Sequence, residues 1–263
     1  MAITFAEHLD LLDLHGRAAV ASLGQLGPTD TLPPRGVPAH PATREHWATL
    51  EIWAWSLGHP GQHWSGRPEP TPPPDHAALV AAIGSELTRL EEGLLAAGPD
   101  TPIDFFGEPG TTGQVARLLA HEAIGVAHAA SLAAGRATPD LSPAVATDGV
   151  DRALAHWAEP DARVVWRPDP VVLRATDTAR SWYLECGSSG RGDHAAFRPT
   201  GTRRPGGVVS SDAATLLWWM HGYPTPESLL EVSSSDDLLL HALRLALGHD
   251  VAPEPRRRSW WRG

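Results

Sequence analysis

The amino-acid sequence predicts a two-domain α+β protein in which an antiparallel four-helix bundle precedes a smaller α+β domain. Before residue 136, four segments repeat their apolar residues at helical spacing, with proline-rich or polar connections between them. After Gly135 the pattern changes to short β-branched or alternating runs followed by helices. Because a chain of 263 residues exceeds a typical single domain, we expect domains over residues 1–140 and 141–250, and a disordered tail over residues 251–263.

The helices of the first domain are predicted from their apolar stripes and from the residues that begin them. The first helix covers about residues 4–23, and the second begins after Pro41 with Thr43 as its N-cap. The third runs from the capping residue Asp75 to about residue 97, and the fourth covers residues 111–135. Because the connections are rich in proline and polar residues, we expect no β-strand within the first 130 residues.

The second domain is predicted from short segments with strand propensity and from two later helices. A short helix over residues 148–157 precedes them. Strands are expected within residues 162–166, 171–176, 181–186, 194–199 and 206–211, and helices within residues 211–222 and 234–247.

Composition excludes several classes of function. The formal net charge of −10 argues against nucleic acid as the main partner. All 21 basic residues are arginine, which removes Schiff-base and P-loop lysine chemistry. The single cysteine, Cys186, excludes an internal disulfide and a cysteine-rich zinc site, and we interpret it as a small core residue rather than a nucleophile. No apolar run is long enough to span a membrane and no signal-peptide pattern opens the chain, so we expect a cytoplasmic protein.

The fourth helix carries the clearest chemical signal. Its apolar stripe includes Val115 and Val126, and Glu122 lies on the same stripe, where a carboxylate is costly to bury unless it is paired, protonated or bound to a metal. His121 and His128 are two helical turns apart on an adjacent face. Histidine is the commonest metal ligand, so this pattern favours a metal site.

The order of several short motifs resembles the mycothiol-dependent maleylpyruvate isomerase family. Members of this family join a DinB-like four-helix metal-binding bundle to a small C-terminal α+β domain of SCP2-like fold. The matching motifs are Ala120-His121-Glu122, Ala133-Ala134-Gly135-Arg136, Asp148-Gly149-Val150, Leu173-Arg174-Ala175-Thr176-Asp177 with Trp182, Val208 through Leu217, Leu230-Glu231-Val232 and Asp237-Leu238-Leu239.

This resemblance implies a divalent metal, typically zinc, whose ligands fall by position on His46, Glu122 and Val126. Valine cannot bind metal, so His46 and Glu122 remain as ligands, and we expect their side chains to face each other. A third ligand could come from His8 or His15 on the first helix, or a rotated or bulged fourth helix could present His121 and His128. The alternative is a buried hydrogen-bonded pair of His46 and Glu122 that holds no metal.

The resemblance further implies a function that depends on the cofactor mycothiol. The metal would bind the sulfur of this thiol, and the protein would isomerise a small electrophilic metabolite or transfer the thiol to it. A second hypothesis is a metal-free, non-catalytic relative that serves as a binding or regulatory module. The expected partner is a small-molecule substrate, with no nucleic acid and no membrane.

Overall fold

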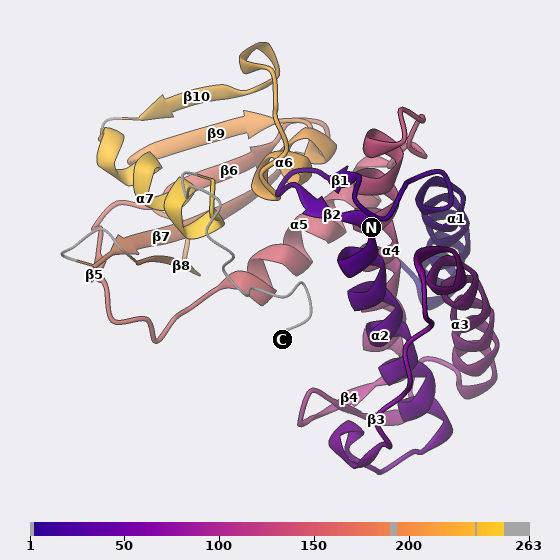
Figure 1. Ribbon diagram of the computed structural model, residues 1–263. Helices are drawn as coiled ribbons and strands as arrows, with labels where there is room; N and C mark the ends of the chain where they lie inside the picture. The colour runs from indigo at the N-terminus through magenta and orange to yellow at the C-terminus, as the bar shows by residue number, and fades with distance from the viewer. Residues whose placement is uncertain (1–2, 190–193, 235, 250–263) are drawn as a thin grey trace. The chain divides into compact units, whose positions relative to one another are not determined.

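The computed structural model describes residues 3–189, 194–234 and 236–249, which form two compact units (Figure 1). The first unit covers residues 3–140 and the second covers the described residues from 141 onward. The predicted tail over residues 251–263 lies outside the described residues. None of the described helices is both long and apolar enough to cross a bilayer.

Four long helices make up most of the first unit. They are α1 (Phe5–Leu23), α2 (Ala39–Gly58), α3 (His76–Ala97) and α4 (Thr112–Ala133), and a 3₁₀ turn, η1 (Trp64–Gly66), lies between α2 and α3. Thr4 and Thr111 form capping boxes at the starts of α1 and α4, and Asp75 caps α3 as predicted, by accepting a hydrogen bond from the amide of Ala78. These side chains satisfy amides that have no partner within the helix.

The prediction that Thr43 caps α2 is wrong. The helix begins at Ala39, after Pro38, and the Thr43 hydroxyl instead donates a 2.7 Å hydrogen bond to the carbonyl of Ala39 within the first turn. Pro41 does not block this start, because amides of the first turn have no intrahelical acceptor to lose.

The expectation that the first 130 residues lack strands is also wrong, because two short hairpins form in the connections. They are β1 (Thr31–Leu32) with β2 (Val37–Pro38), and β3 (Pro102–Phe105) with β4 (Glu108–Thr111). The second hairpin turns at Phe106 and Gly107, whose φ angles are 58° and 89°. Such a two-residue turn needs positive φ values, and no Asn-Gly or Asp-Gly pair signals it here.

We expected an antiparallel bundle, and this expectation is wrong for α2 and α3, which run parallel. The rings of His40 and His76, at the N-terminal ends of the two helices, have centroids 6.3 Å apart. At the C-terminal ends, a Cβ on Gly93 would lie 3.4 Å from Cδ1 of Leu57. The connection over residues 59–75 is long enough to return the chain along α2, a helix about 30 Å long.

The helices α1 and α4 also run parallel. His8 lies beside His121 near the beginning of the interface, and Ser22 lies beside Ser131 near its end. By contrast, α1 and α3 are antiparallel, since Nε2 of His76 at the start of α3 is 3.0 Å from the carbonyl oxygen at the end of α1. The first unit therefore contains two parallel helix pairs, α1–α4 and α2–α3, and the two pairs run in opposite directions.

The second unit contains a mixed six-stranded sheet with the order β10-β9-β6-β7-β5, and β8 also pairs with β7. Figure 1 shows β10, β9, β6 and β7 side by side. The β6–β9 pair is parallel and the other described pairs are antiparallel. The strands are β5 (Val165–Trp166), β6 (Val171–Ala175), β7 (Arg180–Ser188), β8 (Ala195–Pro199), β9 (Gly207–Ser211) and β10 (Glu231–Ser234).

Three helices pack on this sheet around one apolar core. They are α5 (Pro143–Trp157), α6 (Ala213–Met220) and α7 (Asp237–Leu247), and a short 3₁₀ turn, η2 (Glu227–Leu229), precedes β10. The predicted helix over residues 148–157 begins earlier, because Ser142 caps α5 and Pro143 occupies its first turn. β10 was not predicted, because its four residues are polar or exposed and show no strand-like alternation of burial.

Candidate functional site

One face of α1 lies against α4 and carries two of the candidate histidines. His8, His15 and Ser22 are spaced seven residues apart, so they lie on one face two turns from each other, and all three are buried. Leu12 and Ala19 lie between them and are fully buried. The apolar residues of this face stabilise the interface, and they hold the histidines away from bulk water.

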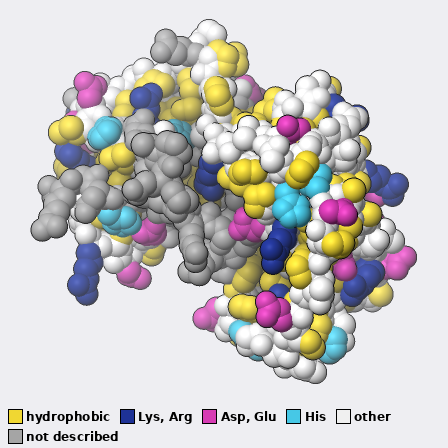
Figure 2. Space-filling view, viewed as in Figure 1, with side chains coloured by type: hydrophobic (Ala, Val, Ile, Leu, Met, Phe, Trp, Pro, Cys, Tyr) yellow, Lys and Arg dark blue, Asp and Glu magenta, His cyan; other side chains and the backbone are white. Residues whose placement is uncertain are grey.

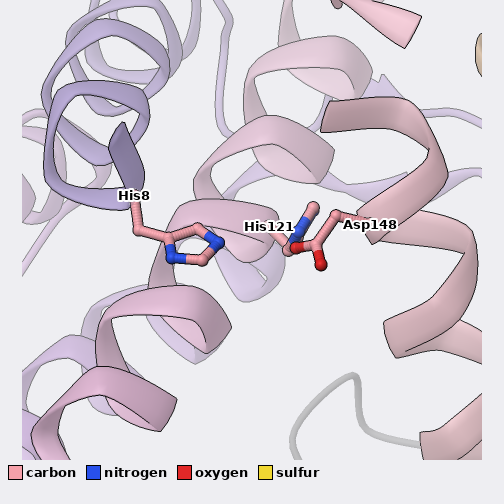
Figure 3. A group of neighbouring side chains, drawn as sticks. All are labelled: His8, His121 and Asp148. Atoms are coloured by element: carbon pink, nitrogen blue, oxygen red, sulfur yellow. The ribbon is translucent and has the colours of Figure 1, made fainter. Parts of the chain in front are cut away.

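His8 on α1 and His121 on α4 bring their imidazole rings together across this interface. Their ring centroids are 6.3 Å apart, and a ring nitrogen of each lies within 4.8 Å of the other. Figure 3 shows the His8 ring projecting from α1 toward His121 on α4. His8 is 5% exposed, and His121 is partly buried. Figure 3 also labels Asp148, which belongs to α5 of the second unit, whereas this pair lies wholly within the first.

His15 is almost completely buried in the same interface. It is 2% exposed, and its Nε2 atom has no hydrogen-bond partner among the described residues. Burial, with a smaller contribution from the neighbouring His121, lowers the pKa of His15 to about 4. The imidazole is therefore neutral at pH 7, which is the form that binds a metal.

His46 and Glu122, the two ligands expected from the family pattern, are both inside the first unit. His46 on α2 is 1% exposed, and Glu122 on α4 is 6% exposed. Burial lowers the pKa of His46 to about 4, so its ring is also neutral at pH 7. The donor atoms of His15, His46 and Glu122 do not all lie within 4.8 Å of one another. The expectation that His46 and Glu122 face each other stays a prediction.

The remaining candidates on α4 are His128 and Val126. His128 is partly buried, and burial lowers its pKa to about 4. Val126 is partly buried and brings no donor atom to the position where the family pattern has its third ligand. The structure therefore does not supply this ligand from α4 at that position.

In the second unit, Cys186 is a core residue, as the sequence predicts. Its thiol is fully buried on β7, and burial, with a smaller effect from the adjacent Glu185 charge, raises its pKa to about 12. A thiol with this pKa is not a nucleophile at neutral pH.

Sequence analysis missed a charge cluster next to Cys186. Arg198 on β8 donates a 2.7 Å hydrogen bond to Glu185 and lies 4.3 Å from the centroid of the Trp166 ring, and Arg203 also pairs with Glu185. These hydrogen bonds and positive charges lower the pKa of Glu185. The opposite charges at directly paired positions of β7 and β8 could have indicated the Glu185–Arg198 pair, but only after the register of the two strands was known.

These features define a two-unit α+β protein whose helical unit buries several histidines and a glutamate. Comparison with models of known protein families gave no match, and comparison with curated proteins gave none. Among solved structures, the chain is similar to the crystal structure of the mycothiol-dependent maleylpyruvate isomerase, with a TM-score of 0.58. It is also similar to a variant of that enzyme with one histidine changed to alanine, with a TM-score of 0.61.

In both comparisons the sequence identity is 13%, and the match covers 88% of this chain and 93% of the other. The chain therefore has the fold of mycothiol-dependent maleylpyruvate isomerase over most of its length. The resemblance expected from the sequence is confirmed at the level of the fold.

Proposed function

We propose that this protein is a mycothiol-dependent, divalent-metal-binding isomerase or thiol transferase that acts on a small electrophilic metabolite. The observation that carries the proposal is the combination of this fold with a neutral imidazole and a carboxylate buried in the helical unit. His46 and Glu122 are 1% and 6% exposed, and the fold similarity covers 88% of the chain. A neutral imidazole and a carboxylate are both ligands that zinc takes in proteins.

In this proposal His46 and Glu122 hold the metal, and zinc is the expected ion. His46 would bind through a ring nitrogen without losing a proton first, because its ring is already neutral at pH 7. Glu122 would contribute an oxygen and reduce the charge of the site. When bound, the ion would hold the mycothiol sulfur as a thiolate at neutral pH, as a nucleophile for cis–trans isomerisation or thiol transfer. The buried apolar residues around the two ligands would limit the access of water.

We further propose that the first unit is a DinB-like four-helix bundle over residues 1–140 and that the second is an SCP2-like domain over residues 141–250. In this proposal the four helices of the bundle are arranged as the parallel pairs α1–α4 and α2–α3. The partner would be a small molecule in the cytoplasm rather than nucleic acid or a membrane. On the face shown in Figure 2, the described arginine and carboxylate side chains are interspersed and form no continuous basic patch.

A second candidate function is a metal-free relative that binds or regulates without catalysis. The observation in its favour is Val126, which occupies the third ligand position of the family pattern. Two protein ligands hold zinc weakly compared with the three of most catalytic sites. In this alternative His46 and Glu122 would be a buried pair held by hydrogen bonds alone.

Metal analysis combined with an activity assay separates the two functions. The purified protein is assayed for zinc per chain, and then for isomerisation of maleylpyruvate and for conjugation of a model electrophile, each with and without mycothiol. The proposal expects thiol-dependent turnover that a chelator abolishes and that zinc restores. His46→Gln and Glu122→Gln are expected to lose both metal and turnover while remaining folded. A protein that shows no thiol-dependent turnover after loading with zinc would overturn the proposal in favour of the second candidate.

A further inference from the structure

A separate set of histidines lies along the α1–α4 interface, outside the His46–Glu122 pair. α1 carries His8 and His15, and α4 carries His121 and His128, each pair seven residues apart. Since the two helices run parallel, the histidines form two rows that face the same interface. His8 and His121 meet across the interface, with their ring centroids 6.3 Å apart.

The geometry of this contact suits one metal ion shared between two rings. A nitrogen of His8 lies within 4.8 Å of a nitrogen of His121. Two nitrogens bound to one zinc, each at about 2.0–2.1 Å, lie less than about 4.2 Å apart, so a small rotation of the rings brings both within bonding distance. The two ligands come from different helices, so one ion would cross-link α1 and α4.

The surroundings of the pair shield it from bulk water. His8 is 5% exposed, and Leu12, one turn further along the same face of α1, is fully buried. Imidazole is the commonest metal ligand in proteins, so two rings from different helices at this separation suit one shared cation.

We propose that His8 and His121 bind a divalent transition metal that ties α1 to α4. Imidazole nitrogens select zinc, nickel or copper rather than magnesium or calcium, whose preferred ligands are oxygens. The site does not depend on the proposed thiol chemistry, because its ligands differ from His46 and Glu122. Its role is structural, since a bound ion stabilises the native pairing of the two helices over the unfolded chain.

The test is a titration of the full-length protein with zinc and with nickel, using magnesium as the control ion. Four matched variants are compared: His8→Gln and His121→Gln remove the proposed ligands, and His15→Gln and His128→Gln change the next histidine along each helix. We expect His8→Gln and His121→Gln to lose at least about tenfold in affinity, because even an outer-shell partner is worth about 10–100-fold. His15→Gln and His128→Gln are expected to keep the affinity to within about threefold.

A second measurement uses only the unaltered protein, so it does not depend on the folding of any variant. Copper ions added in small amounts should broaden the imidazole NMR signals of His8 and His121 before those of the other histidines, His46 of the first proposed site excepted. Earlier broadening of any histidine other than His46, or equal losses of affinity in all four variants, would overturn the inference. The same series in a His46→Gln background distinguishes the two sites. If the His8–His121 site survives there while the unaltered protein, loaded with zinc, shows no thiol-dependent turnover, the inference stands and only the proposed function fails.

Discussion

The hydroxyl groups of Ser22 and Ser131 lie 3.0 Å apart and share a hydrogen bond between α1 and α4, where both residues are 1% exposed. Together with the His8–His121 contact, this bond defines the parallel register of the two helices. A polar pair in an otherwise apolar interface is stabilising only while both partners are present, because a lone buried hydroxyl loses its bond to water without a replacement.

We therefore expect Ser22→Ala or Ser131→Ala alone to lower the free energy of unfolding by about 1–3 kcal/mol. The double variant leaves no buried hydroxyl unsatisfied, so it should cost clearly less than the sum of the two single changes. Urea unfolding of the unaltered protein, the two single variants and the double variant gives the coupling energy between the two hydroxyl groups. Additive losses would show that the two hydroxyls do not bond to each other.

The second prediction concerns the reactivity of Cys186. Because burial raises the pKa of this thiol to about 12, the native protein should not react with a thiol reagent at pH 7–8. After unfolding in urea, one thiol per chain should react at the rate of a free cysteine. Cys186→Ala should keep any thiol-dependent activity, whereas rapid labelling of the native protein would contradict the core position of this residue.

Helix ends were predictable where a side chain gives a local signal. Thr4, Asp75 and Thr111 each accept a hydrogen bond from the amide three residues later, which is a property of a few neighbouring residues. The start of α2 was misplaced because a plausible N-cap, Thr43, competes with a start after Pro38 that has no side-chain cap. The tertiary packing of the helix decides between these starts, and the local sequence does not record that packing.

Helix directions and the His8–His121 contact could not be predicted, because both depend on how distant segments pack. The sequence identified His8 as a possible third ligand on the first helix, but it did not indicate that the neighbour of His8 comes from α4 rather than α2. The two short hairpins could not be predicted for a different reason. With strands of two to four residues, no alternation of polar and apolar residues is long enough to recognise.

The third prediction is a loss of stability in mild acid. Burial lowers the pKa values of His15 and His46 from 6.5 to about 4, so between these pH values the unfolded chain binds more protons than the native protein. The free energy of unfolding should therefore be highest above pH 6.5 and fall as the pH is lowered toward 4. Each histidine should contribute on the order of 1–3 kcal/mol to this fall.

Urea unfolding at pH values from 8 to 4, in the presence of a chelator, measures this dependence without a contribution from bound metal. His46→Gln should remove the part of this pH-dependent loss of stability that His46 contributes, and it should leave the part that His15 contributes. A stability that is constant between pH 7 and pH 5 would mean that these rings are solvated in the native protein.

The last prediction concerns the missing third ligand on α4. Val126→His would place an imidazole four residues after Glu122, on the same face of the helix, as in the family pattern. If His46 and Glu122 bind zinc as proposed, the new ligand should complete a three-residue site and raise zinc affinity by at least about tenfold. Without metal, the polar ring replaces a partly buried valine and should lower the free energy of unfolding by about 1–3 kcal/mol.

Zinc titrations of both proteins, with thermal melts in zinc and in a chelator, test this prediction. Zinc binding by the unaltered protein should weaken as the pH falls toward 4, where the His46 ring takes up a proton in competition with the metal. The matched control is His128→Gln combined with Val126→His, which should retain the gain, because His128 lies six residues from Glu122 on a different side of α4. If Val126→His brings no gain while His46→Gln still loses metal, the third ligand comes from another helix. If neither change alters zinc binding, the correspondence between α4 and the family pattern is wrong, and the metal site proposed at Glu122 must be abandoned.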